Sequence, residues 1–387
     1  MRILTTSTPG MGHLNSILPL SIALRAAGHE VLFVTASESC GLVRALGFAV
    51  QAGGMAAADR RASLAPRMPE ILALPPRRRR GVYFSGFFAE AAAPMMRNDL
   101  KTVFDEFRPD LVIHELAELA AAPMAVARDI PHVTVAFSGA LPQWSDALTI
   151  QGIAPLWAAE GLPVPTIDDL GGDLYLHPFP PSFGQVPDSG VVQPMRAESL
   201  EHDAGQRPRW LDDLGTFRPL IYVTAGTEPA SGMAPWAATI AALGAMNVDA
   251  IATIGAHLDM SVLGNVPPNV RVERFVPQRF VLDQATVAMS HGGAGSLLGA
   301  ARRGLPQLLA PLVADQWENA DAAFAAGVAI TCELDQRTDT ELGAALHRLL
   351  HDVRFRDAAS EVAQEIADMP SPADCVKTIE ALLTDRN

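Results

Sequence analysis

The apolar positions near the amino terminus fall into two short runs with an amphipathic segment between them. Residues 1–6 and 30–35 are short and mainly apolar, so each predicts a buried strand. Between them, residues 14–27 place apolar side chains at mixed spacings of three and four, which predicts a helix ending at Gly28. Pro19 fits this helix if it lies in the first turn. The order is typical of a doubly wound α/β fold, whose sites collect at the carboxyl ends of the strands.

The same alternation returns after a polar and charged segment at residues 194–218. We interpret this segment as a linker between two α/β halves, and a cleft between such halves is a usual place for an active site with two substrates. The strands predicted in the second half are residues 220–224, 249–254, 270–275, 285–289 and 306–310, with helices at 235–245 and 316–326.

Regular alternation fails between residues 49 and 97. This segment contains several prolines, an arginine run at residues 77–80, and scattered methionine and aromatic residues. Long irregular segments are often functional, so one interpretation is an adaptable pocket for a flat, apolar ligand. The other is a set of ordinary core helices beneath a solvated arginine loop. The sequence leaves both open.

Length and charge narrow the class of protein. A chain of 387 residues exceeds the usual size of one hydrophobic core, which predicts two domains. The net charge of −14 argues against a broad surface for nucleic acid or an anionic membrane. We find no apolar run long enough for a membrane span and no secretory pattern. Cys40, Cys332 and Cys375 match no metal-binding spacing and leave one thiol unpaired, which favours a reducing cytoplasm.

A glycine-rich turn follows the run at residues 285–289 and precedes an Ala/Leu-rich helical run. Free N–H groups and a helix N-terminus therefore meet at one place, which suits a phosphate. His291 at the entrance and Ser296 on the first helical turn can both donate to phosphate oxygens. An ordinary tight turn between strand and helix is the alternative.

His13 lies on the loop that leaves the first strand, and Glu115 follows the strand predicted at residues 110–114. In a parallel sheet both would lie on one edge, where a carboxylate can orient a histidine and stabilise its imidazolium. The alternative is that Glu115 is only the N-terminal charge of a helix at 116–128. The nearby Gly10 and Gly12 lack the third glycine of a dinucleotide fingerprint, so NAD is not favoured.

Asp315 and Gln316 follow the last predicted strand. A carboxylate that only accepts and an amide that both donates and accepts suit vicinal hydroxyl groups. The alternative is that Asp315 only caps the helix at 316–326. A phosphate turn and a pair suited to hydroxyl groups on one edge of a sheet indicate a nucleotide sugar.

The chain resembles the GT-B glycosyltransferases of family one, in the bacterial branch that decorates polyketide antibiotics. The resemblance covers nearly the whole chain, although many relatives carry aspartate at the position of Glu115. The motifs that carry it are Gly12-His13-Leu14-Asn15, Phe275-Val276-Pro277-Gln278, His291-Gly292-Gly293-Ala294-Gly295-Ser296, and Pro311, Asp315, Gln316 and Asn319.

The resemblance implies an α/β chain with the GT-B fold, in which two facing doubly wound Rossmann-like domains enclose a deep cleft. Residues 1–205 would bind the acceptor, residues 206–370 the donor, and a helix at 371–387 would pack back toward the first domain. The implied reaction is inverting transfer of a (deoxy)sugar from a nucleoside diphosphate donor, TDP rather than UDP by expectation, to a hydrophobic aglycone. Neither a metal nor another cofactor is implied.

The same resemblance implies the site residues. His13 would be the general base and Glu115 its partner. The diphosphate would be held by His291, Gly292, Gly293, Ser296 and Thr227, the base and ribose by Val276 and Gln278, and the sugar by Asp315 and Gln316. Another sugar-nucleotide enzyme of this fold, such as an epimerase or hydrolase, and a noncatalytic auxiliary partner are the alternatives. The sequence leaves open the aglycone, the sugar, the choice of O- or C-glycoside, and whether a homodimer forms.

Overall fold

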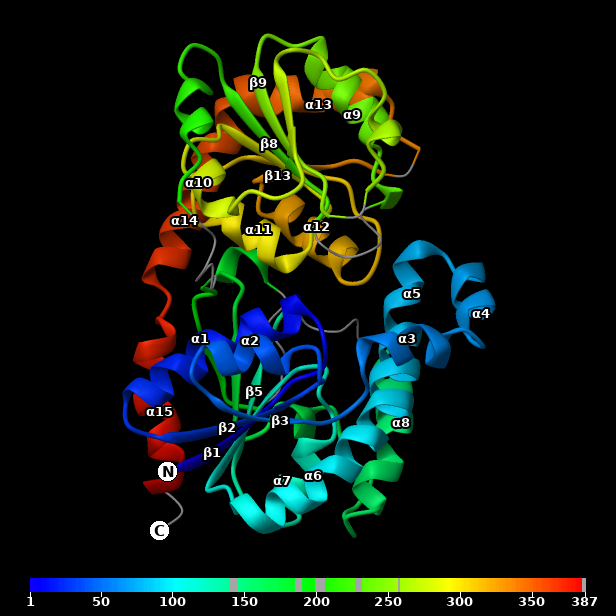
Figure 1. Ribbon diagram of the computed structural model, residues 1–387, viewed down its shortest axis with the longest axis vertical. Coiled ribbons are helices and arrows are strands. Elements are labelled where there is room, and N and C mark those ends of the chain that lie inside the picture. The colour runs from blue at the N-terminus through cyan, green and yellow to red at the C-terminus, as the bar shows by residue number, and fades with distance from the viewer. Residues whose placement is uncertain are drawn as a thin grey trace. The chain divides into compact units, whose positions relative to one another are not determined.

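A computed structural model gives the structure of the chain as two compact units. The first unit comprises Met1–Phe179, Gln185–Leu200 and Met369–Asn387, and the second comprises Pro180–Gly184 and Glu201–Asp368. Each unit is built around one sheet with helices on both faces (Figure 1). The structure describes residues 1–139, 145–184, 190–198, 206–226, 232–256, 258–333 and 335–384.

The sheet of the first unit has seven strands in the order β3-β2-β1-β4-β5-β6-β7, and all its neighbouring strands are parallel. Successive side chains of a strand point to opposite faces. Ile3 of β1 therefore belongs to the core on one face and Leu4 to the core on the other. The strands are β1 (Arg2–Thr6), β2 (Glu30–Thr35), β3 (Ala49–Ala52), β4 (Leu111–Glu115), β5 (His132–Val135), β6 (Leu174–His177) and β7 (Val192–Pro194).

Different helices cover the two faces of this sheet. Side chains of α1 (Met11–Ala26) and α15 (Pro372–Thr384) pack around Ile3. Those of α6 (Ala93–Phe107), α7 (Ala121–Val126) and α8 (Asp146–Ala158) pack around Leu4. The other helices of this unit are α2 (Cys40–Ala45), α3 (Ala57–Leu64), α4 (Met68–Ala73), α5 (Pro76–Tyr83), the π-helix η1 (Phe84–Ala92) and the 3-10 turn η3 (Asp168–Leu170).

The second unit repeats the plan with six strands in the order β10-β9-β8-β11-β12-β13, again with parallel neighbours. Helices α9 and α13 pack on one face, and α10 and α11 on the other. The strands are β8 (Leu220–Thr224), β9 (Asp249–Thr253), β10 (Val270–Glu273), β11 (Val287–Ser290), β12 (Gln307–Leu309) and β13 (Ala329–Thr331). The helices are α9 (Trp236–Gly244), α10 (Gln278–Leu282), α11 (Ala294–Ala301), α12 (Gln316–Ala325), α13 (Asp339–His351) and α14 (Val353–Asp368), with 3-10 turns η4 (Pro181–Phe183), η5 (Arg209–Asp213) and η7 (Met260–Leu263).

Both strand orders reverse direction at one point, between β1 and β4 in the first unit and between β8 and β11 in the second. Loops that leave neighbouring strands at such a point diverge to opposite faces, and the crevice between them is the usual ligand site of a doubly wound sheet. The residues after β1, β4, β8 and β11 are therefore those in which chemistry is expected.

The structure corrects three details of the sequence interpretation. Pro19 lies in the middle of α1 rather than in its first turn, between Leu18 and Leu20, whose complete burial favours continuation of the helix. The helix predicted from residue 116 begins only at Ala121. The irregular segment contains β3 and a series of helices, and Arg80 of its arginine run is buried rather than solvated.

Cys40, Cys332 and Cys375 are buried free thiols. Among the helices of the described residues, none combines the length and the apolar character needed to cross a membrane.

Candidate active site

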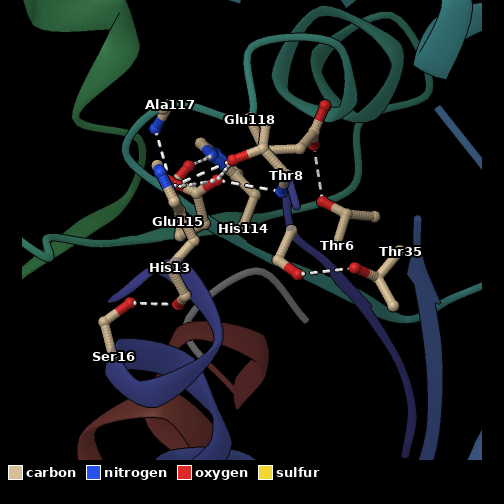
Figure 2. A network of polar contacts seen from close by, with 10 residues as sticks. Thr6, Thr8, His13, Ser16, Thr35, His114, Glu115, Ala117 and Glu118 are labelled. Atoms are coloured by element: carbon tan, nitrogen blue, oxygen red, sulfur yellow. Dashed lines mark hydrogen bonds and ion pairs between the residues drawn. The ribbon is translucent and has the colours of Figure 1, made fainter. Parts of the chain in front are cut away.

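The first candidate site lies where β1 and β4 end, and Figure 2 shows its polar contacts. His13 stands in the first turn of α1, and its Nδ1 lies 3.2 Å from Oε1 of Glu115, the last residue of β4. Thr8 Oγ1 lies 3.1 Å from the same ring nitrogen. A ring oriented through Nδ1 leaves Nε2 to accept a proton.

Glu115 is completely buried and held by several donors. Its carboxylate accepts from the Thr8 N–H at 3.0 Å, from the Ala117 N–H at 2.6 Å and from the Thr8 hydroxyl (Figure 2). Burial raises the pKa of Glu115, but the charge of His13 and the hydrogen bonds from His13 and Thr8 outweigh it, so that the pKa lies below its ordinary value. Glu115 is therefore ionised beside His13. It does not stand at a helix N-terminus, because α7 begins at Ala121.

Aromatic side chains border the ring of His13. The ring centroid of Phe137, which follows β5, lies 4.3 Å from that of His13, and the centroid of Phe88, on η1, lies at 5.6 Å. Arg80 donates to Ser138 Oγ at 2.9 Å and to the Gly139 carbonyl at 3.2 Å, which anchors the segment next to Phe137. The base candidate therefore faces apolar surface as well as its carboxylate partner.

Glu118 is a residue that the sequence interpretation missed. Its carboxylate is buried and accepts from the Thr6 hydroxyl (Figure 2). It also accepts from the N–H groups of Ala120 and Ala121. Burial, with a smaller contribution from the charge of Glu115, raises the pKa of Glu118 to about 7 against these hydrogen bonds. Its only sequence signal is a second glutamate three residues after Glu115, without any indication of burial.

The raised pKa of Glu118 makes stability depend on pH. Between the ordinary glutamate pKa of 4.5 and about 7, the folded protein binds more protons at Glu118 than the unfolded chain does, so this residue makes stability fall as pH rises through that window. We expect the stability of Glu118→Gln to lack this dependence on pH, because glutamine does not titrate. Urea unfolding at about pH 5 and about pH 8 measures it. An equal free-energy difference between wild type and variant at both pH values would contradict the prediction.

The second candidate site is the glycine-rich turn after β11. Gly293 stands at the N-cap of α11 and has no side chain to cap it, so among the described residues the first N–H groups of this helix are left for a ligand. The ring of His291 lies against Gly226 and Gly293, where an added Cβ would stand 2.8 Å from ring carbon Cε1 and 2.4 Å from Nε2 respectively. Both positions therefore need glycine to accommodate the ring. Ser296 is half-buried in the first turn of α11.

Burial lowers the pKa of His291 to about 4, although the Asp315 carboxylate and the Thr224 backbone act in the opposite direction. The ring is therefore neutral at pH 7 in the absence of a ligand and can donate one N–H. A pocket at the carboxyl ends of β8 and β11 is lined by His291, Thr224 and Ser290, together with Trp236 of α9.

Asp315 and Gln316 stand where α12 begins, as the sequence predicts. The Asp315 side chain does not cap this helix but accepts from Asn319 Nδ2 at 2.9 Å. Gln316 Oε1 accepts from the N–H groups of Leu312 at 2.8 Å and Val313 at 2.9 Å. The side-chain oxygen of Gln316 thus stabilises the loop before α12. Only the N–H groups of its amide remain to donate to a ligand.

The remaining predicted donor-binding residues differ in how far their side chains are exposed. The side chain of Val276 is 4% exposed and belongs to the core, so only its main chain could meet a base. Gln278 lies over α11, with its Nε2 at the place where a Cβ on Gly299 would stand. Phe275, by contrast, is 67% exposed next to them, and an exposed aromatic residue can stack on a base. Thr227 lies outside the described residues.

Two Rossmann-like units, with candidate sites at their switch points, are the plan of the GT-B fold. The glycosyltransferase SnogD from Streptomyces nogalater superposes with a TM-score of 0.77 at 27% identity, over 99% of each chain. The glycosyltransferase VinC, solved in complex with DTDP, gives a TM-score of 0.81 at 25% identity over 100% of each chain.

Sequence comparison gives the family. The model for the erythromycin biosynthesis protein CIII-like C-terminal domain matches residues 237–382. The L-demethylnoviosyl transferase of Streptomyces niveus is 30% identical over 96% of this chain and 96% of its own length. The chain therefore belongs to the GT-B glycosyltransferases of antibiotic biosynthesis, and the protein is a glycosyltransferase.

Proposed function

We propose that this glycosyltransferase moves a deoxysugar from a TDP-sugar to a hydrophobic natural-product aglycone with inversion at the anomeric carbon, and that His13 is its general base. The observation that carries the proposal is the hydrogen-bonded group of His13, Thr8 and Glu115 beside Phe88 and Phe137. The DTDP bound to VinC and the demethylnoviosyl group named for the Streptomyces niveus relative support the donor class.

In the proposed step, the acceptor hydroxyl attacks the anomeric carbon from the face opposite the diphosphate. Its proton passes to Nε2 of His13, and the ionised Glu115 stabilises the imidazolium. The bond from the anomeric carbon to the diphosphate oxygen breaks, and its electron pair leaves with the nucleoside diphosphate. General base catalysis of this kind contributes ~10²–10⁴-fold.

The departing diphosphate would be stabilised by the turn after β11. The uncapped N–H groups of α11, together with the positive end of its dipole, are fixed before the reaction begins. His291 adds an N–H donor, and Ser296 adds a hydroxyl. In this proposal Gln278, Phe275 and the main chain of Val276 meet the nucleoside, while Asp315 and the amide of Gln316 meet the sugar hydroxyls.

Mass spectrometry of the products from a panel of aromatic and macrolide aglycones, with TDP- and UDP-sugars, tests the proposal. We expect a glycoside with a TDP-sugar, with the anomeric configuration opposite to that of the donor by NMR. Hydrolysis or epimerisation of the donor without transfer would favour another sugar-nucleotide chemistry. Binding of TDP without turnover of any donor would favour an auxiliary role.

Activity is expected to persist in excess EDTA, because protein donors rather than a bridging magnesium ion would stabilise the leaving group. Initial rates with and without EDTA, and after addition of Mg²⁺, measure this directly. Complete loss in EDTA with recovery in Mg²⁺ would overturn the assignment of the diphosphate site.

A further inference from the structure

One buried amide, that of Asn319, connects the glycine-rich turn after β11 to Asp315 at the start of α12. Asn319, on α12, is 1% exposed. Its Nδ2 donates to the carbonyl of Gly292 in the glycine-rich turn at 2.9 Å, and to Oδ2 of Asp315 at 2.9 Å. The two hydrogens of a single nitrogen therefore connect the proposed phosphate turn to the proposed sugar-reading carboxylate.

The same two segments also touch through their backbones. Gly292 has a φ of 81°, and a Cβ added there would stand 3.0 Å from the carbonyl oxygen of Gln316. The glycine-rich turn and the start of α12 are thus packed without room for another side chain. The amide of Asn319 fixes the distance between these two segments, because one of its hydrogen bonds goes to Gly292 in the turn and the other goes to Asp315 at the start of α12.

Among the described residues, Asn319 is paired only through its donor side. Its Oδ1 is buried, and no described residue donates to it. A buried acceptor without a partner costs stability. Asparagine at this position is therefore not explained by packing alone, whereas its two donated hydrogen bonds give it a definite role.

We propose that Asn319 is a positioning residue that holds the Asp315 carboxylate in register with the diphosphate turn and thereby sets selectivity for the sugar. The inference rests on the proposed function, in which both segments hold one donor molecule. The diphosphate and the sugar are joined by a single glycosidic bond, so a shift of Asp315 relative to the turn would misalign the hydroxyl contacts and the anomeric carbon.

The test is a double-mutant cycle on sugar selectivity. The ratio of kcat/KM for two TDP-sugars that differ in one hydroxyl is measured for wild type, Asp315→Ala, Asn319→Ala and the double variant. We expect each single variant to reduce the ratio by about tenfold, and the double variant to lose no more, because Asn319 acts through Asp315. Unchanged selectivity in Asn319→Ala, or effects that multiply, would overturn the inference.

Two further variants separate positioning from folding. Asn269 is a matched control, because its Nδ2 donates to the carbonyls of Leu243, Met246 and Val248 next to the amino end of β10. Asn269→Ala should lower stability and keep the selectivity ratio. Asn319→Leu keeps the branched shape of the side chain but donates no hydrogen bond at any pH, so it should lose selectivity at least as strongly as Asn319→Ala. Wild-type selectivity in Asn319→Leu would overturn the inference.

Binding of free TDP distinguishes failure of this inference from failure of the proposed function. If the wild-type protein neither binds TDP in calorimetry nor transfers a sugar, the proposed function is wrong. If it binds TDP and transfers a sugar, but the Asn319 variants keep full selectivity, only the role of Asn319 is wrong.

Discussion

His13→Ala is expected to lower kcat by ~10²-fold or more while leaving the affinity for TDP nearly unchanged. The substitution removes the proposed proton acceptor, whereas the residues proposed to bind the nucleotide belong to the second unit. Steady-state kinetics at saturating donor and acceptor give kcat, and calorimetry with TDP gives the affinity. His29→Ala is a matched control, because His29 contacts Glu380 at 3.0 Å, away from the proposed machinery, and should keep its kcat. Near-wild-type turnover in His13→Ala would eliminate the proposed role.

Glu115→Gln tests the partner of the base in the same experiment. Glutamine keeps the shape and the acceptor oxygen but removes the charge that stabilises the imidazolium. We expect kcat to fall, though less than in His13→Ala, because the base itself remains. A variant with wild-type kcat would show that Glu115 only holds the loops that end β1 and β4.

His291→Ala is expected to weaken free TDP and the intact donor alike, by roughly 1.5–3 kcal/mol, because a hydrogen bond to an ionised acceptor is lost. Every nucleoside diphosphate presents the same phosphate oxygens to this ring, so the effect should not depend on the sugar. Calorimetry with TDP and kinetics with two TDP-sugars measure the two affinities separately.

Asp315→Ala and Gln316→Ala test the proposed contacts with the sugar, as His291→Ala tests the contact with the diphosphate. Both should leave the affinity for free TDP unchanged, but reduce kcat/KM and the discrimination between sugars that differ in their hydroxyls, because buried polar groups left unpaired enforce such discrimination. If Asp315→Ala weakened TDP as much as His291→Ala does, Asp315 would be shaping the phosphate turn, and its proposed contact with the sugar would be wrong.

The sequence by itself predicted most of the strands, though not β3, β6, β7 or β13, and it assigned the candidate site residues to the carboxyl ends of strands. The bounds predicted at residues 30–35 and 220–224 are those of β2 and β8, because buried parallel strands are short continuous apolar runs. His13 and Glu115 could be assigned to one edge because parallel strands end on the same side of their sheet. The glycine-rich turn was recognisable because a strand, glycines and a helix follow one another directly in the chain.

Only the tertiary structure decided which atoms meet at that edge. Thr6 pairs with His114 in the register of β1 and β4, which brings Glu118 to the Thr6 hydroxyl across 112 positions of sequence. The burial of Val276 and the double hydrogen bond of Asn319 likewise depend on side-chain packing between elements. Apolar periodicity reflects which face of an element is buried, whereas a hydrogen bond is set within tenths of an ångström by register and packing between distant segments, and no local pattern records that information.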